Sequence, residues 1–381
     1  MEKEVNMFLF LLLGIAIVGV LWDFYYKKVW IKDVDVKLWF DTDALYAGGQ
    51  TKLYEVIENR KRTPLPVLEV GFHTKKELDF ADTENTSVSD YIYKRDVFSI
   101  LGRQRITREI AVNCKKRGHY AVSDADLTTH TLLYKKSYSV GIETDTSIYV
   151  YAKMTDVSEI MTVCERMLGT LQCAKRLYED PFAFRTIRSY TTDDPMKTIN
   201  WKASAKTGAL MVNTFDSVQS QKVMIFLDVA DTGILKQEAL VEENIAIAAT
   251  LVRKLLRQSI ETGFAFNSAD SGEWILPTNK KSVLVGLERT LADYDAAKGT
   301  TPFSELVTGK QETLQKLTDD TLLIVVTKNL DETLWEILKE KSKDYAVLVI
   351  ETVYRGEQQF AHAKEVLPNG MRVLVREVER V

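Results

Sequence analysis

Apolar and polar residues alternate along much of residues 33–151, and this pattern predicts short β-strands. Successive side chains of a strand point to opposite faces of a sheet, so one face of the first strand carries Val34, Val36, Leu38 and Phe40. Further strands are predicted at 53–59, 65–72, 106–114 and 147–151, with a turn at 48–49. Short strands at this spacing are typical of an antiparallel β-sandwich, which we assign to residues 31–154.

The chain begins with an uninterrupted apolar stretch, Met7 to Trp22, which predicts a transmembrane helix and a membrane anchor over residues 1–30. A helix from Met7 to Tyr26 would be roughly 30 Å long, enough to cross a bilayer. A cleaved signal peptide is one alternative, but the leading segment has little positive charge and no small residues offer a cleavage point after Trp22. A buried core helix is another, but the stretch has no polar face.

Basic residues flank this stretch unequally and predict its orientation. One lysine precedes it, whereas the lysines that follow it closely are Lys27, Lys28, Lys32 and Lys37. Lysine and arginine accumulate on the cytoplasmic side of membrane spans. We therefore expect a single-pass protein of the cell membrane with the bulk of the chain in the cytoplasm.

The rest of the chain joins a helix to an alternation of strands and helices. A helix is predicted from Thr155 to Leu177, where apolar residues recur mostly every three or four positions. The strongly apolar strands lie at 223–228, 322–327 and 345–352, and the helices at 240–263, 281–291 and 331–341, the first stopping at Gly263. Such strands belong to a mostly parallel sheet covered by helices. Residues 155–220 are therefore a connecting helix and a motif segment, and residues 221–381 an α/β domain.

Composition adds little about function. The chain has 381 residues, a net charge of −4 and 27% charged residues of both signs, which gives no indication of nucleic-acid binding. Its length predicts two or three domains. The cysteines, Cys114, Cys164 and Cys173, follow no metal-ligand spacing, so we expect neither structural disulfides nor a zinc site.

The polar stretch after Arg185 carries the most specific pattern of the chain. Pro195 disfavours helix in the residue before it, and the short polar side chains preceding it predict a turn. Residues 199–204 alternate between apolar and polar, which predicts a hairpin that turns at 206–208. This hairpin would point Trp201 inward as a core anchor. The alternative is a docking surface formed by Arg188, Asp193, Asp194 and Lys197.

Several residues of this stretch fall at characteristic spacings: Arg188, Tyr190, Asp193, Asp194, Asn200, Trp201, Lys202, Ser204, Ala205, Lys206 and Gly208. Their order closely resembles the pattern of the family called domain of unknown function 58, with Lys197 in place of an arginine. The resemblance implies a von Willebrand factor A-like domain after residue 220. It also implies work alongside a MoxR-type AAA ATPase, and often a second apolar helix near the amino terminus, which this chain lacks.

A von Willebrand factor A-like domain would hold Mg²⁺ at the carboxyl end of its sheet, and the resemblance indicates the ligand positions. Asp228 begins the first ligand loop, Thr232 can replace a serine of that loop, and Thr301 belongs to a second loop. Ala230 presents a methyl group where a hydroxyl ligand is needed, and Lys328 brings positive charge near the third ligand. We therefore expect a degenerate site at which Mg²⁺ is disfavoured, and no cofactor.

Asp228 also follows an apolar strand as the first aspartate of haloacid dehalogenase phosphatases does. The second aspartate of that pattern is out of phase at Asp231, because Ala230 takes its place, so the general acid is missing. No other common hydrolase motif occurs in the chain. We therefore expect a non-catalytic, membrane-anchored interaction or scaffold protein. The alternative is a membrane-associated, metal-dependent hydrolase that uses Asp228 and Asp231.

Overall fold

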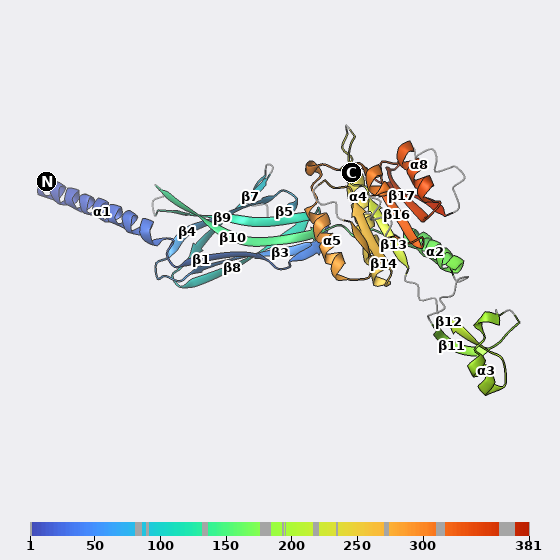
Figure 1. Cartoon of the computed structure of the whole chain (residues 1–381). Coiled ribbons are helices and arrows are strands. Elements are labelled where there is room, and N and C mark those ends of the chain that lie inside the picture. Colours follow the sequence, from blue (N-terminus) through green and yellow to red (C-terminus); the bar gives the residue numbers. More distant parts are fainter. Residues whose placement is uncertain are drawn as a thin grey trace. The chain divides into compact units, whose positions relative to one another are not determined.

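The chain forms two compact units, Met1–Lys153 with Leu291–Asp293, and Met154–Thr290 with Tyr294–Val381. Figure 1 labels their helices and strands. The computed structural model describes residues 2–80, 86–88, 91–131, 136–175, 184–192, 194, 196–215, 221–233, 235–269, 274–309, 317–357 and 370–380.

The first unit joins helix α1, Glu2–Val29, to a sandwich of two β-sheets (Figure 1). The four-stranded sheet has the order β1-β3-β8-β5, with β1 Val34–Phe40, β3 Gln50–Asn59, β8 Gln104–Cys114 and β5 Leu78–Phe80. The six-stranded sheet has the order β2-β10-β9-β4-β7-β6, with β2 Ala44–Tyr46, β10 Ser137–Tyr151, β9 Gly118–His130, β4 Leu65–Lys75, β7 Tyr91–Ile100 and β6 Thr86–Val88. The pairing is antiparallel except between β2 and β10. The β-rich architecture expected for this region is confirmed.

Inward side chains of the two sheets form two apolar clusters, one around Leu53 and Ile92 and one around Ile57 and Phe98. Charged residues lie between them. Glu55 separates Leu53 from Ile57 on the inward side of β3, and Lys94 and Asp96 separate Ile92 from Phe98 on β7. Side chains alternate between the two faces of a strand, so this charged layer crosses the interior of the sandwich.

Glu55 is the exceptional member of this layer. Asp96 pairs with Arg108 at 3.1 Å and with Lys94 at 3.6 Å, whereas neither carboxylate oxygen of Glu55 has a hydrogen-bond partner among the described residues. Burial raises the pKa of Glu55 from 4.5 to about 8; the charge of Asp96 adds to this rise, and Arg108 and Lys94 oppose it. Burial thus favours the protonated, neutral form of Glu55 in the folded state.

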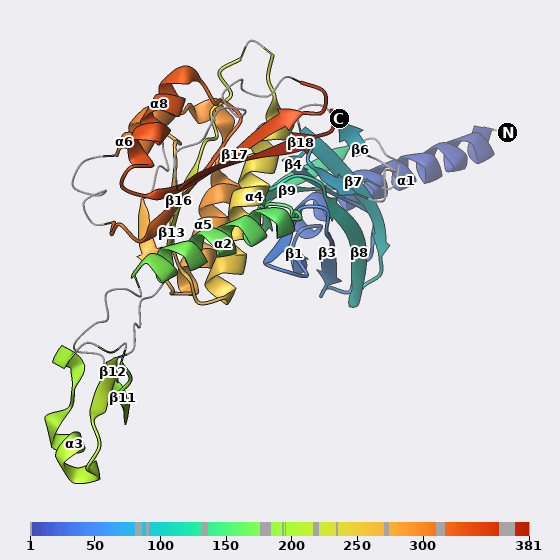
Figure 2. The ribbon, with the colours of Figure 1, turned by 90° about the vertical axis from the view of Figure 1, so that its right-hand side faces the viewer.

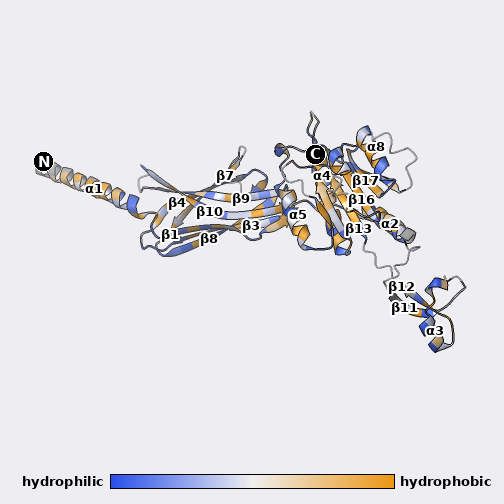
Figure 3. Ribbon diagram, in the orientation of Figure 1, coloured by the Kyte–Doolittle hydropathy of each residue, from blue (hydrophilic) through white to orange (hydrophobic). Residues whose placement is uncertain are grey.

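Helix α1 exposes large apolar side chains along its length, including Phe10 at 74%, Ile17 at 53% and Leu21 at 63% exposure. Figure 3 shows this helix as a largely hydrophobic rod. A membrane span had been expected here. Over the part of the chain that the structure describes, no helix meets the length and apolarity required to cross a membrane.

The second unit is built on a six-stranded sheet in the order β15-β14-β13-β16-β17-β18. Its strands are β13 Lys222–Leu227, β14 Glu261–Phe266, β15 Ile275–Thr278, β16 Thr321–Thr327, β17 Ala346–Tyr354 and β18 Met371–Val378. All neighbours are parallel except β15, which pairs antiparallel with β14. The mostly parallel sheet expected here is present, with β13 as its first strand in the chain and at its centre.

Helices cover both faces of this sheet (Figure 2). They are α2 Ser158–Lys175, α4 Glu238–Arg257, α5 Ser282–Asp293, α6 Phe303–Thr308 and α8 Glu332–Lys341, with a 3-10 turn η2 at Ala296–Lys298. On one face, Trp335 of α8 and Val307 of α6 pack with Phe226 and Val325 of the sheet. Helix α4 packs along the sheet with an almost entirely buried inner side.

One predicted helix boundary is wrong. Helix α4 ends at Arg257, before Gly263, and the chain turns through Ser259, whose φ is 61°. Gly263 lies inside β14 instead. A Cβ there would approach the Met224 sulfur and the Ile275 carbonyl oxygen to 2.7 Å, so this glycine permits close packing within the sheet rather than ending a helix.

The motif segment between α2 and β13 contains β11 Phe184–Ser189, a 3-10 turn η1 Met196–Thr198, helix α3 Trp201–Thr207 and β12 Met211–Phe215. Strands β11 and β12 pair antiparallel. The hairpin predicted for residues 199–208 is therefore wrong. The Asn200 side chain accepts a hydrogen bond from the Ala203 amide at 2.9 Å and starts a helix, which ends at Gly208 with φ 73°.

Candidate functional site

A pocket of about 410 Å³ lies at the carboxyl end of β13 and its two neighbours in the sheet. In open α/β sheets, ligands bind where the chain leaves the first strand and the strand order reverses. The pocket brings together Asp228, Thr232 and Thr301, the three positions predicted for a degenerate metal site. Asn329 and Asp331, which follow β16, add to its polar lining.

Asp228 is held at the base of this pocket by hydrogen bonds to both carboxylate oxygens. Its Oδ1 accepts from the Ala230 amide at 3.0 Å and from Asn267 Nδ2 at 2.9 Å. Its Oδ2 accepts from Thr327 Oγ1 at 2.7 Å and from Asn329 Nδ2 at 2.9 Å. Asp228 is only 1% exposed. Neutral donors thus satisfy a buried carboxylate, as burial of a charge requires.

The residues that hold Asp228 are fixed to the surrounding loops in turn. Asn267, which follows β14, accepts from the Val229 amide at 2.8 Å and donates to the Thr301 carbonyl at 3.2 Å. Asn329 also donates to the Ala230 carbonyl at 2.9 Å. Sequence reasoning missed both asparagines. Their positions could have indicated a role in the site, because Asn267 directly follows the buried strand β14 and Asn329 lies two residues after the buried strand β16.

These residues do not fit an Mg²⁺ ion. Mg²⁺ needs hard oxygen ligands in near-octahedral geometry. The Asp228 oxygens are already engaged by two side-chain amides, a hydroxyl and a backbone amide, and Ala230 offers only its methyl group. Among the described residues, no cluster of three or more His, Cys, Asp or Glu side chains is placed to hold a metal ion.

Asp231, the second carboxylate of the hydrolase alternative, is directed elsewhere. Its Oδ1 lies 2.9 Å from Lys328 Nζ, and both side chains are largely buried. Lys328 also donates to Gln237 Oε1 at 3.1 Å. The second Asp231 oxygen accepts from the Gln237 amide at 2.8 Å. Lys328 therefore neutralises Asp231 instead of facing a cation in the pocket.

The rest of the pocket lining combines hydroxyl groups with the apolar side chains of Ala230, Pro302, Phe303 and Leu334. Hydroxyl groups come from Thr232, Thr300, Thr301, Ser304 and Thr333. The carboxylate of Asp331 lies at the start of α8, where its Oδ1 accepts from the Leu334 amide at 2.7 Å. Such a lining can hydrogen-bond a ligand, but it contains no histidine, cysteine or lysine for acid, base or nucleophilic work.

The motif segment places its predicted residues in two groups. One group builds the fold of the segment. Asn200 caps α3, and its side-chain amide donates to Asn213 Oδ1 at 2.8 Å. Ser204 Oγ donates to the Asn200 carbonyl at 2.8 Å and accepts from the Met211 amide at 2.9 Å. The Tyr190 amide donates to the Leu210 carbonyl. Asp193 lies outside the described residues.

Arg188 and Asp194 form the most strongly connected ion pair of this segment. Two guanidinium nitrogens of Arg188 contact the two Asp194 oxygens at 2.7 and 2.6 Å. Thr191 donates to the same carboxylate through its amide and its hydroxyl. The Arg188 hydrogen bonds, followed by those from Thr191, hold the pKa of Asp194 well below its usual value. This pair fixes the loop before η1.

The second group faces outward. Trp201 is 66% exposed, which contradicts its expected burial as a core anchor. The helix that replaces the predicted strand explains the difference, because Ser204 turns inward in its place. Lys202, Ala205 and Lys206 are exposed with Trp201. Met196 at 69% and Leu210 at 44% add exposed apolar side chains in the same segment.

Comparison with known families supports the resemblance seen in the sequence. The family model described as "Protein of unknown function DUF58" matches residues 186–368. This match supports the DUF58 family. It covers nearly all of the motif segment, the pocket of the α/β domain and its sheet apart from β18. No curated protein matches the chain.

Several solved structures align with about a third of the chain at low TM-scores. A non-cellulosomal cohesin from Archaeoglobus fulgidus has 12% identity over 34% of this chain and 97% of its own, with a TM-score of 0.22. A CARDB domain from Pyrococcus furiosus is 11% identical in sequence, and the alignment covers 30% of this chain and 96% of that domain, with a TM-score of 0.20. CaCohA2 from Clostridium acetobutylicum is 14% identical in sequence, and the alignment covers 31% of this chain and 90% of that protein, with a TM-score of 0.21. The sandwich assignment itself rests on the two sheets of the first unit.

Proposed function

We propose that this chain is a non-catalytic, membrane-anchored scaffold that docks a protein partner through its DUF58 motif segment. The observation that carries the proposal is the exposure of Trp201 on α3, with Lys202 and Lys206 one helical turn apart beside it. Tryptophan is enriched among residues that dominate binding energy at protein interfaces. This surface differs from the docking surface of Arg188, Asp193, Asp194 and Lys197 considered from the sequence, because Arg188 and Asp194 pair with each other.

The α/β domain supports a binding role rather than the hydrolase alternative. Hydrolysis through Asp228 and Asp231 would need both carboxylates to be available. Hydrogen bonds occupy both oxygens of Asp228, and Lys328 and Gln237 hold Asp231. We propose a von Willebrand factor A-like fold for this domain. Its strand order, with the third strand antiparallel at the edge, favours that assignment.

The exposed apolar surface of α1 supports the proposed anchor. Large apolar side chains of this helix are exposed, among them Met7, Phe10, Leu13, Val18 and Phe24. Burying apolar surface in a bilayer is favourable by about 25 cal/mol per Å². Lys27 and Lys28 follow at the carboxyl end. We propose a single pass with the bulk of the chain in the cytoplasm, on the positive-inside rule.

We further propose a MoxR-type AAA ATPase as the protein partner. This expectation comes from the resemblance to domain of unknown function 58. The basic and aromatic face of α3 would suit an acidic surface with an apolar recess on that partner, because opposite charges guide association and a buried tryptophan supplies affinity.

Replacing Trp201 by alanine should separate binding from folding. Removing an exposed side chain typically changes stability by no more than about 0.5 kcal/mol, so the melting temperature should stay within about 2 °C of wild type. Affinity capture of the full chain from its native membrane should lose the ATPase, detected by mass spectrometry of the co-purifying proteins.

A matched control is Leu235→Ala, which removes another exposed apolar side chain, 83% exposed, outside the motif segment. This variant should retain the partner. A large fall in melting temperature for Trp201→Ala would restore the core-anchor interpretation. Equal partner recovery from both variants would refute docking through α3.

A further inference from the structure

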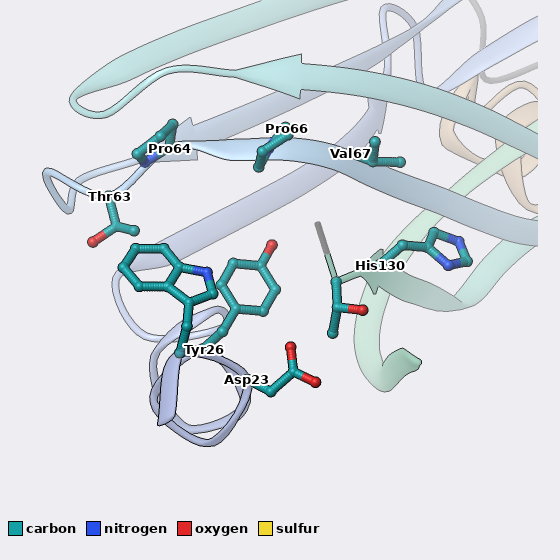
Figure 4. A pocket seen from close by; sticks show the side chains of 9 residues that line it. Asp23, Tyr26, Thr63, Pro64, Pro66, Val67 and His130 are labelled. Atoms are coloured by element: carbon teal, nitrogen blue, oxygen red, sulfur yellow. The ribbon is translucent and has the colours of Figure 1, made fainter. Parts of the chain in front are cut away.

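A second pocket, of about 170 Å³, lies where α1 meets the end of the sandwich (Figure 4). Its α1 wall is formed by Trp22, Asp23 and Tyr26. Its opposite wall is formed by Pro64, Pro66 and Val67 at the start of β4, and the end of β9 closes it at His130 and Thr131. The walls combine these aromatic and aliphatic side chains with the polar side chains of Asp23, Thr63, His130 and Thr131.

Helix α1 is held against the sandwich at the pocket and at the residues that follow it. The Tyr26 hydroxyl lies 2.9 Å from Thr129 Oγ1, which in turn donates to the Val67 carbonyl at 2.7 Å. One turn later Trp30 is only 3% exposed. Lys61 Nζ donates to the Val29 carbonyl at 3.0 Å. A preformed pocket binds a ligand without the entropic cost of ordering its walls.

The pocket is continuous with the exposed apolar surface of α1. Trp22 lines it and is also 43% exposed, next to Leu21 at 63% and Tyr25 at 49%. The lysines that follow, Lys27 and Lys28, are exposed. Membrane-spanning helices often carry tryptophan and tyrosine, followed by lysine, at the point where they pass from the hydrocarbon core of the bilayer into the headgroup layer.

Asp23, which lines the pocket, forms an ion pair with Lys136. Asp23 Oδ2 lies 3.7 Å from Lys136 Nζ, and both side chains are partly exposed. His130 Nε2 lies 3.1 Å from Glu69 Oε1. A loose, partly exposed ion pair contributes little by itself and can exchange its partners. The phosphate and ammonium of a zwitterionic lipid headgroup would complement Lys136 and Asp23, respectively.

We propose that this pocket binds one zwitterionic phospholipid of the surrounding bilayer. Its acyl chain lies against Trp22, Pro66 and Val67, and its ammonium and phosphate meet Asp23 and Lys136. The proposal rests on the membrane anchoring proposed above. The bound lipid would join α1 to the sandwich at the membrane surface and hold the sandwich in a fixed orientation relative to the bilayer.

The test is native mass spectrometry of the detergent-purified full chain with phosphatidylethanolamine or phosphatidylglycerol at equal concentration. We expect phosphatidylethanolamine adducts to exceed phosphatidylglycerol adducts about fivefold, which corresponds to about 1 kcal/mol. Val67→Trp should fill the pocket and remove the phosphatidylethanolamine adduct. Asp23→Asn should leave lipid binding but abolish the preference for the ammonium headgroup.

Val97→Trp is the matched control, because Val97 is 53% exposed on β7 and does not line the pocket. It should bind lipid as wild type does, and the melting temperatures of all variants should confirm that they fold. Equal adducts of the two lipids on wild type, or an unchanged adduct on Val67→Trp, would overturn the proposal. Alkaline extraction of native membranes tests the membrane anchor separately from lipid binding by the pocket. Release of the wild-type protein into the supernatant would refute the anchor, independently of the lipid-binding result.

Discussion

Asp228→Ala should destabilise the α/β domain severely without any ligand being involved. The substitution leaves the Ala230 amide, Asn267 Nδ2, Thr327 Oγ1 and Asn329 Nδ2 without their shared acceptor. Each buried donor left unsatisfied costs about 1–3 kcal/mol, so we expect a combined loss of about 3–5 kcal/mol after water enters the site. Calorimetry of the full chain should record a fall of roughly 10 °C in the melting temperature of this domain.

Two comparisons make this result specific. Asp331→Asn changes another carboxylate of the same pocket but keeps the cap of α8, because asparagine caps helices as well as aspartate does, so its melting temperature should stay near wild type. Millimolar Mg²⁺ should not shift wild type, whereas a bound ligand at a hundredfold excess over its Kd would add about 2.7 kcal/mol. A Mg²⁺-dependent rise that disappears in Asp228→Ala would contradict a metal-free site.

The stability of the β-sandwich should fall as pH rises from about 5 to 8, because of Glu55. Its pKa rises from 4.5 to about 8 on folding, chiefly through burial. In this window the folded state holds a proton that the unfolded chain releases. The free energy of unfolding should therefore decrease by up to about 1.4 kcal/mol per pH unit, and level off above the folded pKa.

Glu55→Gln should remove this pH dependence, because glutamine is neutral at every pH and has nearly the same shape. Above pH 8 the variant should melt at a higher temperature than wild type, and the two curves should converge below about pH 4.5. Glu109→Gln is the matched control, since Glu109 is an exposed carboxylate paired with Lys52 on β8 of the same sandwich. Parallel pH profiles for wild type and Glu55→Gln would show that Glu55 is ionised in the folded state.

The sheets were predictable because their buried strands leave a strong pattern in the sequence. Val34 to Phe40 alternates, and Leu322 to Val326 is entirely apolar, and both became strands as expected. Strand β9 was missed because it pairs with β10 across an irregularity near Val122. Ser123 and Asp124 are both exposed at that point, which breaks the alternation on which the prediction depends.

The motif segment was misread for a related reason. Helix α3 has only seven residues, too few to show a helical period, and Ile199, Trp201 and Ala203 happen to alternate as a strand does. The better signals were its ends, a capping Asn200 and a left-handed Gly208. Buried polar residues such as Glu55 and Asn267 depend on neighbours from distant strands, so the local pattern does not distinguish them from surface positions.

Site-specific photo-cross-linking at position 201 tests the central claim most directly. A photoreactive aromatic amino acid, which keeps a large apolar ring at this position, replaces Trp201 in the full chain. Native membranes are then irradiated, and adducts are identified by mass spectrometry. The account predicts a covalent adduct with a protein partner, a MoxR-type ATPase, and none from the same amino acid at position 235. No adduct at position 201 above the level at position 235 would contradict the claim that this chain works by docking a partner through α3.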